Sequence, residues 1–282
     1  MPTTIRVRKA DGSQEEFLMS KLEHSLRRAG ASKEEVQDIS RAIEKEIYDG
    51  ITTEVLYRKA FELLRQSERV IAARYSLRRA MIGLGPTGFP FEDYLAELFR
   101  TQGYTARTRA IIKGKCVSHE VDIVAHKGAD CLIAEAKFHM QPGTKSDLQV
   151  ALYSYARFLD ITSLTTTQGR KKEPCATIKP YVITNTKFTS TAIDYAKCVG
   201  LTLLSWDYPR KGNLQDLIEQ TKLYPVTVLQ TLAEREKRAL LQQGTVLCRD
   251  VIDNNAILRS AGVAQKKVGT VMEESARLCS IV

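Results

Sequence analysis

Two acidic residues and a lysine in the middle of the chain have the types and spacing needed for metal-assisted phosphate chemistry. Asp122 precedes Glu135 and Lys137 by about the number of residues that a short β-hairpin needs. Residues two apart on a strand share a face, so Glu135 and Lys137 point the same way, and a hairpin partner can bring Asp122 beside them. Two carboxylates form a hard-oxygen site for Mg²⁺, and a neighbouring ammonium can orient water or stabilise developing negative charge.

Two strands joined by a short turn are expected to position these residues. Apolar residues alternate along Val121–Ala125 and again along Leu132–Ala136, and Lys127–Asp130 supplies the turn. Charged residues on the solvent face of a hairpin are commonplace, so the three residues alone also fit an ordinary exposed hairpin.

The ordered set of a helical glutamate, a strand aspartate and a strand Glu-x-Lys resembles the PD-(D/E)xK nuclease superfamily, in particular its Mrr-like restriction endonuclease and archaeal Holliday-junction resolvase branch. Glu92 matches the helical acidic residue, in a segment that opens at Gly88 and runs through Phe99. The resemblance implies a DNA endonuclease of restriction, defence or DNA-processing type that uses Mg²⁺ or Mn²⁺. Asp122 and Glu135 would bind the metal, Lys137 would position the water, and Glu92 would complete the metal shell.

Further polar residues are candidates for contact with DNA. They are His119, His139, Gln149, Lys187, Lys266 and Lys267. The two histidines flank the proposed site, but together with Cys116 and Asp122 they match no zinc-site spacing. Gln149 also fits a solvated helix position. The polar stretch Thr165–Pro174 is predicted to be a loop, whose basic residues are either available for phosphates or simply solvated.

The N-terminal residues predict a small hairpin followed by helices. Asp11-Gly12 is the expected turn within Ile5–Phe17. A helix is expected after Ser32, which has Glu35 three residues later in a capping-box pattern, and Thr53 is the expected cap of the next helix.

This opening unit resembles the ATP-cone, the regulatory domain at the front of ribonucleotide reductases and certain transcriptional repressors. Val7, Lys9, Asp11 and Gly12 match its signature. The resemblance implies ATP or dATP as an effector, bound near Val7, Lys9, Glu15, Lys21, Leu22, Thr53 and Tyr57. Ala10 stands where the family usually has a second basic residue, so a cone that keeps its shape but has lost nucleotide binding is the alternative.

The expected fold is α/β and α+β in three domains. Gly83–Pro90 is rich in glycine and proline and marks a linker. The predicted domains are the ATP-cone at 1–84, a mixed sheet flanked by helices at 85–208, and a helical module at 209–282. Within the last, Ala261-Gly262-Val263 followed by Lys266 and Lys267 resembles a helix-hairpin-helix that holds a DNA phosphate, although a short helical hairpin is equally a packing module.

Composition limits the remaining possibilities. The 282 residues carry a formal net charge of +9, which favours an anionic partner such as DNA. No apolar run is long enough for a membrane span, and no signal-peptide pattern is present, so we expect a cytoplasmic protein without a membrane partner. The six cysteines lack CxxC spacing, and we expect them to be reduced.

Two functional hypotheses follow. In the first, the chain is a nuclease, and cleavage of both DNA strands by one site per chain implies a homo-oligomer. In the second, it is a catalytically silent, nucleotide-sensing DNA-binding regulator in which the nuclease fold only grips DNA.

Overall fold

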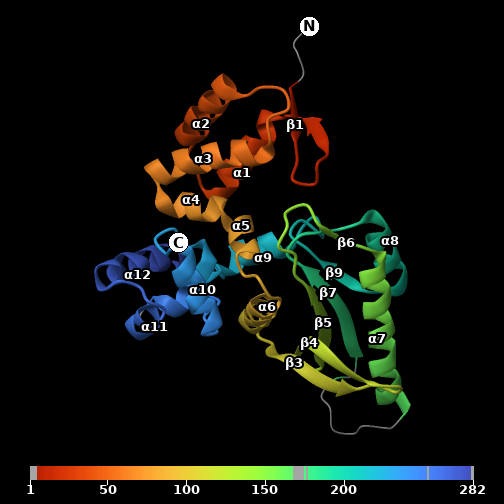
Figure 1. Ribbon diagram of the computed structural model, residues 1–282. Coiled ribbons are helices and arrows are strands. Elements are labelled where there is room, and N and C mark those ends of the chain that lie inside the picture. The colour runs from red at the N-terminus through yellow and green to blue at the C-terminus, as the bar shows by residue number, and fades with distance from the viewer. Residues whose placement is uncertain (1–4, 168–174, 176, 253, 281–282) are drawn as a thin grey trace. The chain divides into compact units, whose positions relative to one another are not determined.

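The computed structural model describes residues 5–167, 175, 177–252 and 254–280, which form two compact units (Figure 1). The first unit combines the described residues up to Met81 with those from Tyr224 onward, and the second comprises Ile82–Leu223. The sequence instead predicts boundaries after residues 84 and 208. The difference arises because the C-terminal helices pack with the N-terminal residues, while the segment before Tyr224 packs with the central sheet.

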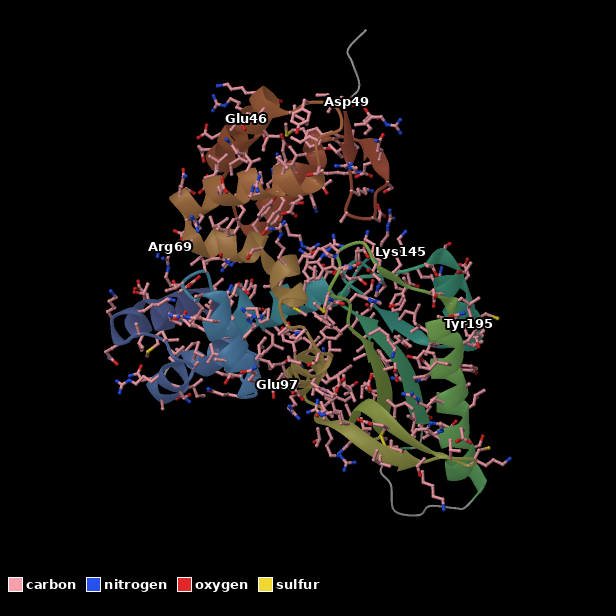
Figure 2. All side chains as sticks on the ribbon, viewed as in Figure 1. Glu46, Asp49, Arg69, Glu97, Lys145 and Tyr195 are labelled. Atoms are coloured by element: carbon pink, nitrogen blue, oxygen red, sulfur yellow. A yellow bond between two sulfur atoms is a disulfide. The ribbon has the colours of Figure 1, made fainter. Side chains whose placement is uncertain are left out.

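The first unit begins with the predicted hairpin. Strands β1 (Arg6–Arg8) and β2 (Gln14–Glu16) are antiparallel, with Val7 opposite Glu15. Gly12 has a φ of +81° in the turn, a conformation that glycine adopts without steric cost. Asp49, labelled in Figure 2, accepts a 2.8 Å hydrogen bond at Oδ1 from the Arg6 amide and ties the hairpin to the helices.

Helices surround an apolar centre beside this hairpin. They are α1 (Met19–Ala29), α2 (Lys33–Glu46), α3 (Thr53–Ser67), α4 (Arg69–Tyr75) and α5 (Leu77–Ile82). Leu26, Ile43 and Leu64 are almost fully buried between them. The capping box of Ser32 and Glu35 is confirmed. The predicted cap of α3 was wrong by one residue, because the Thr52 side chain, not that of Thr53, accepts from the Val55 amide.

The same unit is completed by short C-terminal elements. They are the 3₁₀ helices η1 (Val226–Val228) and η2 (Cys248–Val251), and the α-helices α10 (Glu234–Gln242), α11 (Asn255–Ser260) and α12 (Gln265–Cys279). Thr227 Oγ1 donates a buried 2.6 Å hydrogen bond to the Ala80 carbonyl, and Arg277 donates to Glu68 at 2.9 Å. These bonds join the two ends of the chain into one unit.

The second unit is built on a mixed sheet. Its strands are β3 (Thr105–Lys113), β4 (Ser118–Lys127), β5 (Asp130–Lys137), β7 (Thr177–Thr184) and β9 (Thr202–Leu204), in the order β3-β4-β5-β7-β9. The β3-β4-β5 pairs are antiparallel, and the β5-β7-β9 pairs are parallel. The predicted mixed α/β multidomain fold is therefore confirmed. A separate parallel pair joins β6 (Lys145–Ser146) to β8 (Lys187–Phe188).

Helices cover this sheet. They are α6 (Phe89–Thr101), α7 (Leu148–Thr167), α8 (Ser190–Val199) and α9 (Leu214–Thr221). In Figure 1, α7 runs along the sheet on the side away from α6. The connection through α8 makes a parallel crossover between β7 and β9, and Thr189 is the N-cap of α8. Tyr94 of α6 donates a buried 2.6 Å hydrogen bond to the Leu223 carbonyl, which holds the end of this unit.

Two expectations about the middle of the chain need correction. Thr165–Thr167, predicted to be in a loop, belong to α7, while Gln168–Pro174, with the basic residues of that loop, lie outside the described residues. Cys131 and Cys175 form a disulfide, whereas all cysteines were expected to be reduced. The pairing has no local spacing pattern, because 44 residues separate the two cysteines and the fold brings them together.

Candidate functional site

Strand β5 presents Glu135 and Lys137 two residues apart. Lys137 Nζ lies 2.7 Å from Glu135 Oε1, and the Glu135 side chain is buried. The middle of β5, which includes Leu132 and Ala134, is buried and so holds the strand in place. The last residues of β5 are half-buried and carry the side chain of Lys137 to the site. The predicted placement of these two side chains on one strand face agrees with this geometry.

Asp122 lies where β4 leaves its register with β5. The paired register extends to Ile123 opposite Ala134, and Asp122 is the next residue along β4. Its Oδ2 accepts a 2.7 Å hydrogen bond from the Ala136 amide, between Glu135 and Lys137 in sequence. The three residues are thus brought together, as the hairpin argument predicts.

Helix α7 supplies two further side chains that the sequence reasoning did not single out. Tyr153 OH donates to Glu135 Oε1 at 2.9 Å, and the Arg157 guanidinium donates to Glu135 Oε2. Arg157 also donates to the Glu120 carbonyl at 3.1 Å. Their spacing of four residues places both on one helix face, which also carries Gln149.

Glu92 approaches from the start of α6 and is held by a basic residue from β3. Arg109 Nη1 donates to Glu92 Oε2 at 3.0 Å, and its Nη2 donates to Asp93 Oδ1 at 2.8 Å. The backbone of Arg109 has a φ of +53°, which is uncommon outside glycine and interrupts the regular strand at the residue that holds Glu92. The helical glutamate therefore has a partner that the motif did not indicate.

The carboxylates of the site repel one another. Burial raises the pKa of Asp122 above its usual value, and the charge of Glu135 raises it further. Burial also raises the pKa of Glu92, against the hydrogen bond from Arg109, and the charge of Asp122 adds to the rise. Burial lowers the pKa of Lys137, but hydrogen bonds to Glu135 and Tyr153 outweigh it and the net shift is upward. The site thus holds a charged lysine beside carboxylates that a cation would stabilise.

The donor set suits a cation that keeps part of its water shell. Within the described residues, no three or more His, Cys, Asp or Glu side chains are grouped so that they could hold a metal by themselves. Asp122 and Glu135 nevertheless supply paired oxygen donors whose mutual repulsion favours an intervening positive charge. Mg²⁺ is commonly held by one or two carboxylates with water and substrate phosphate, so the pair fits Mg²⁺ or the similar Mn²⁺.

An open pocket of about 510 Å³ adjoins Lys137. The segment that follows β5 forms one wall, and Pro86 and Gly88 form another. His139 lines it, and its ring Nε2 lies 3.0 Å from Ser146 Oγ. Burial, and then the nearby Lys137, lower the pKa of His139. His139 is therefore next to the site, as the sequence suggested.

The remaining DNA-contact candidates have other surroundings. His119 Nε2 lies 2.7 Å from Asp160 of α7, and Lys187 Nζ lies 2.6 Å from Asp207. Lys267 forms an ion pair with the buried Glu236, while Lys266 and Gln149 are exposed. His119 and Lys267 therefore have structural partners, which the sequence did not indicate. Contact with DNA remains a prediction for all of these residues.

The nucleotide candidates of the first unit gather partly into one cluster. Glu15 Oε2 lies 2.6 Å from Lys9 Nζ and 3.4 Å from Lys21 Nζ. The Lys9 hydrogen bond holds the pKa of Glu15 below its usual value. Val7 is buried in the apolar centre below, and Leu22 packs against that centre. The two lysines thus face one carboxylate between them.

Thr53 and Tyr57 approach from α3. Residues Arg8 and Thr52 form a parallel bridge, which places the start of α3 beside β1. The Tyr57 ring stacks on Tyr75 with centroids 5.1 Å apart, and the Arg79 guanidinium lies 3.8 Å from its centroid. Burial raises the pKa of Tyr57 to about 12. Tyr57 therefore packs within the helices, and its expected place near a nucleotide remains a prediction.

Comparison with known proteins identifies both ends of the chain. The family model for the ATP cone domain matches residues 5–81, and that described as AF1548-like, C-terminal, matches residues 224–279. The first match confirms the resemblance to the ATP-cone. The matched residues include the hairpin, Lys9 beside its turn and Lys21 on α1.

One relative and one solved structure extend the comparison. An uncharacterised protein of Archaeoglobus fulgidus is 36% identical over 185 residues, which cover 65% of this chain and 99% of that protein. A solved structure described as the crystal structure of a protein of unknown function, AF1548, matches with a TM-score of 0.55 and 33% identity, over 68% of this chain and 98% of that one. Neither description states an activity. In the part of the chain that the structure describes, no helix has the length and apolar character of a membrane span.

Proposed function

This chain belongs to the AF1548-like family, and from that premise we propose that it is a metal-dependent DNA endonuclease regulated by a nucleotide at its ATP-cone. The observation that carries the proposal is the meeting of Asp122, Glu135 and Lys137 at the end of β5. Two acidic side chains and an ammonium that meet around the buried Glu135 suit hydrolysis of a phosphodiester better than simple attraction of a DNA backbone.

The carboxylates would hold the divalent cation. Oδ2 of Asp122 accepts a hydrogen bond from the Ala136 amide, and this bond orients the Asp122 side chain toward β5. Glu135 would contribute an oxygen released from its basic partners, and Glu92 would act directly or through water. When bound, Mg²⁺ or Mn²⁺ would supply positive charge for the pentacovalent phosphorus and lower the pKa of the attacking water.

Lys137 is suited to orient that water or to stabilise developing negative charge. Its raised pKa keeps the ammonium charged at neutral pH. Tyr153 lies against it, with Nζ 5.1 Å from the ring centroid, and fixes the side chain from the α7 side. The direction of the ammonium is thus set before substrate arrives, which lowers the cost of reaching the transition state.

The first unit would provide regulation. Lys9 and Lys21 offer two positive charges for the phosphates of ATP or dATP, and Glu15 between them would exchange these partners for the nucleotide. Nucleotide binding would favour one assembly of a homo-oligomer to the extent that it binds that assembly more tightly.

A catalytically silent, nucleotide-sensing DNA-binding regulator is the second candidate. It is favoured by the saturation of Glu135, which accepts from Tyr153, Lys137 and Arg157 and forms a network that is satisfied without metal. If the site had only a structural role, these contacts of Glu135 would stay intact at every step of DNA binding. The two candidates differ in whether Glu135 can be altered without loss of function.

Cleavage of DNA distinguishes the candidates. Purified protein is incubated with plasmid and branched DNA, with Mg²⁺ or Mn²⁺ and with or without ATP or dATP. We expect cleavage by the natural chain and by Glu97→Gln, a partly exposed control on α6, but none by Glu135→Gln or Lys137→Met, with DNA binding retained by both. Equal cleavage by Glu135→Gln, or DNA binding without cleavage by the natural chain under all these conditions, would reject the nuclease.

A further inference from the structure

We propose that the open pocket beside Lys137 binds one unpaired nucleobase of the DNA strand that is cleaved. The inference rests on the proposed function and adds a substrate class to it: DNA in which a base next to the scissile phosphate is unpaired or can be extruded. It follows from the lining of the pocket, its fixed wall, its size and its position.

The lining offers apolar surface on which a base can stack. Met140 is 55% exposed, and the half-buried Phe138 and the exposed Pro86 line the pocket with it. An exposed methionine next to an aromatic ring is an adaptable stacking surface for a flat ligand. Base stacking on such side chains tolerates any sequence, because every base has a π-face.

Phe138 is held in place from behind. Its ring packs at 45° to that of Phe91, with the centroids 5.7 Å apart. A Cβ added to Gly85 would come within 2.9 Å of Phe138 Cε1, so only glycine permits this approach of the backbone. The ring is therefore fixed between α6 and the linker before any ligand binds, which reduces the ordering cost of binding.

The adjacent wall is equally fixed. The side chain of Asn185, itself buried, accepts from the His139 amide at 2.8 Å and donates to the His139 carbonyl at 2.9 Å. This pair of bonds locks the chain just after Lys137. A loop between a catalytic lysine and a stacking methionine, secured at both backbone atoms, is suited to precise placement of a substrate.

The dimensions and polar groups fit a nucleotide. A volume of about 510 Å³ lies within the range of about 300–1,000 Å³ that is typical of small-ligand sites. Gln141 and Thr144 line the pocket and can meet the hydrogen-bonding edge of a base. A base in an intact duplex is stacked on both faces and its edge is paired, so only an unpaired or extruded base can enter.

Lys137 connects the pocket with the cleavage site. The same residue lines the pocket and contacts Glu135, so a strand whose base occupies the pocket would run its phosphates toward the carboxylates. The base would thereby set which phosphate is presented. This explains why a pocket with apolar side chains opens beside the ion pair of Lys137 and Glu135.

Binding measurements without added metal test the inference independently of cleavage. Fluorescence anisotropy of the full chain compares a duplex, the same duplex with one unpaired base, a single strand, and a duplex with an abasic residue at the unpaired position. We expect the unpaired base to bind about tenfold more tightly than the abasic residue, and Met140→Ala to remove most of that preference. Ile111→Ala, which alters an exposed apolar residue on β3, should retain it.

The outcomes separate this inference from the nuclease proposal. An equal affinity for unpaired base and abasic residue, or the same preference in Met140→Ala as in the natural chain, overturns the pocket even if DNA is cleaved. A Met140-dependent preference in a protein that cleaves no DNA supports the pocket and overturns the nuclease. A preference confined to the single strand, with none for the unpaired base in the duplex, likewise overturns the pocket.

Discussion

Arg157 of α7 holds one oxygen of Glu135, while Lys137 holds the other. Both oxygens of the carboxylate are therefore engaged by positive charge that the protein itself supplies. A divalent cation at this site has to displace one of these groups. Arg157 is the better candidate for displacement, because Lys137 would be needed beside the attacking water.

Replacement of Arg157 by Gln is expected to strengthen metal binding. The change removes a charge that competes for Glu135, and the half-saturating concentration of Mg²⁺ should fall about tenfold, the size of one charged hydrogen bond. Calorimetric titration of Mg²⁺ or Mn²⁺ into the full chain measures it. Arg41→Gln, which breaks an exposed ion pair on α2, is the control. Weaker metal binding by Arg157→Gln would mean that Arg157 positions Glu135 for the metal.

Asp122→Asn is expected to stabilise the fold at neutral pH while removing cleavage. Its raised pKa means that the folded chain binds this proton more tightly than the unfolded chain, so natural stability rises as pH falls through the raised value. The variant lacks the repulsion at every pH. Its gain should be no more than about 1 kcal/mol, since water screens a partly buried group, and should shrink in acid.

Thermal unfolding across pH measures this difference. Added Mg²⁺ should raise the melting temperature of the natural chain and leave that of Asp122→Asn nearly unchanged, because ligand binding stabilises only the form that binds it. A variant less stable than the natural chain at neutral pH would show that the Ala136 hydrogen bond outweighs the repulsion.

The sequence predicted the parts of the site that depend on local pattern. Alternation along β4 and β5 brings Asp122 next to Glu135 and Lys137. Ser32 and Glu35 likewise form a capping box because all its atoms come from four consecutive residues. In each case a local pattern of residue types identifies the element that makes the interaction.

The parts that were missed depend on long-range packing. Arg157 reaches Glu135 across 22 residues, and Arg109 reaches Glu92 across 17, with no repeat that relates either pair. The Cys131–Cys175 bond closes a still larger separation. Such partners are fixed by the way in which helices pack on the sheet, so a single sequence carries little sign of them.

Glu15→Gln is expected to strengthen ATP or dATP binding if the cone is functional. Loss of the carboxylate frees Lys9 and Lys21 and removes repulsion of the phosphates, for a gain of about fivefold to tenfold. Replacing both lysines by Ala should weaken binding by about 1.5–3 kcal/mol per lost charged hydrogen bond. Calorimetry on the full chain measures both. Glu23→Gln, on the neighbouring α1, is the matched control.

Nucleotide binding that is absent in the natural chain would support a cone that has kept its shape without its ligand. Ala10, in place of a second basic residue, would then be the reason.

Thr52→Ala and Thr53→Ala should separate stability from ligand binding. Thr52 caps α3, so its loss should cost about 1 kcal/mol in unfolding by urea. Thr53→Ala should change stability by less than about 0.5 kcal/mol but weaken nucleotide binding if the family position holds. Equal stability loss in both variants would contradict the assignment of the cap.

The assembly of the chain is expected to depend on nucleotide. Light scattering across an ATP or dATP titration should show a change in mass that parallels a change in cleavage rate, because one state is favoured by its higher affinity. Arg79→Gln, distant in sequence from the lysines, tests whether packing on Tyr57 transmits the effect. Constant mass and constant activity in a saturated cone would make the bound nucleotide a structural ligand only.

The hydrogen bonds from Thr227 to Ala80 and from Gln230 to Ser76 imply an order in which the parts of this protein fold during synthesis. Ribosomes add about 5–20 residues each second, so synthesis of the central unit delays those C-terminal partners by several seconds at least. During that interval the ends of α4 and α5 await their partners, and the central sheet can fold first. A ribosome that stalls within the central unit therefore leaves the unit with the ATP-cone unfinished, open to chaperones and proteases.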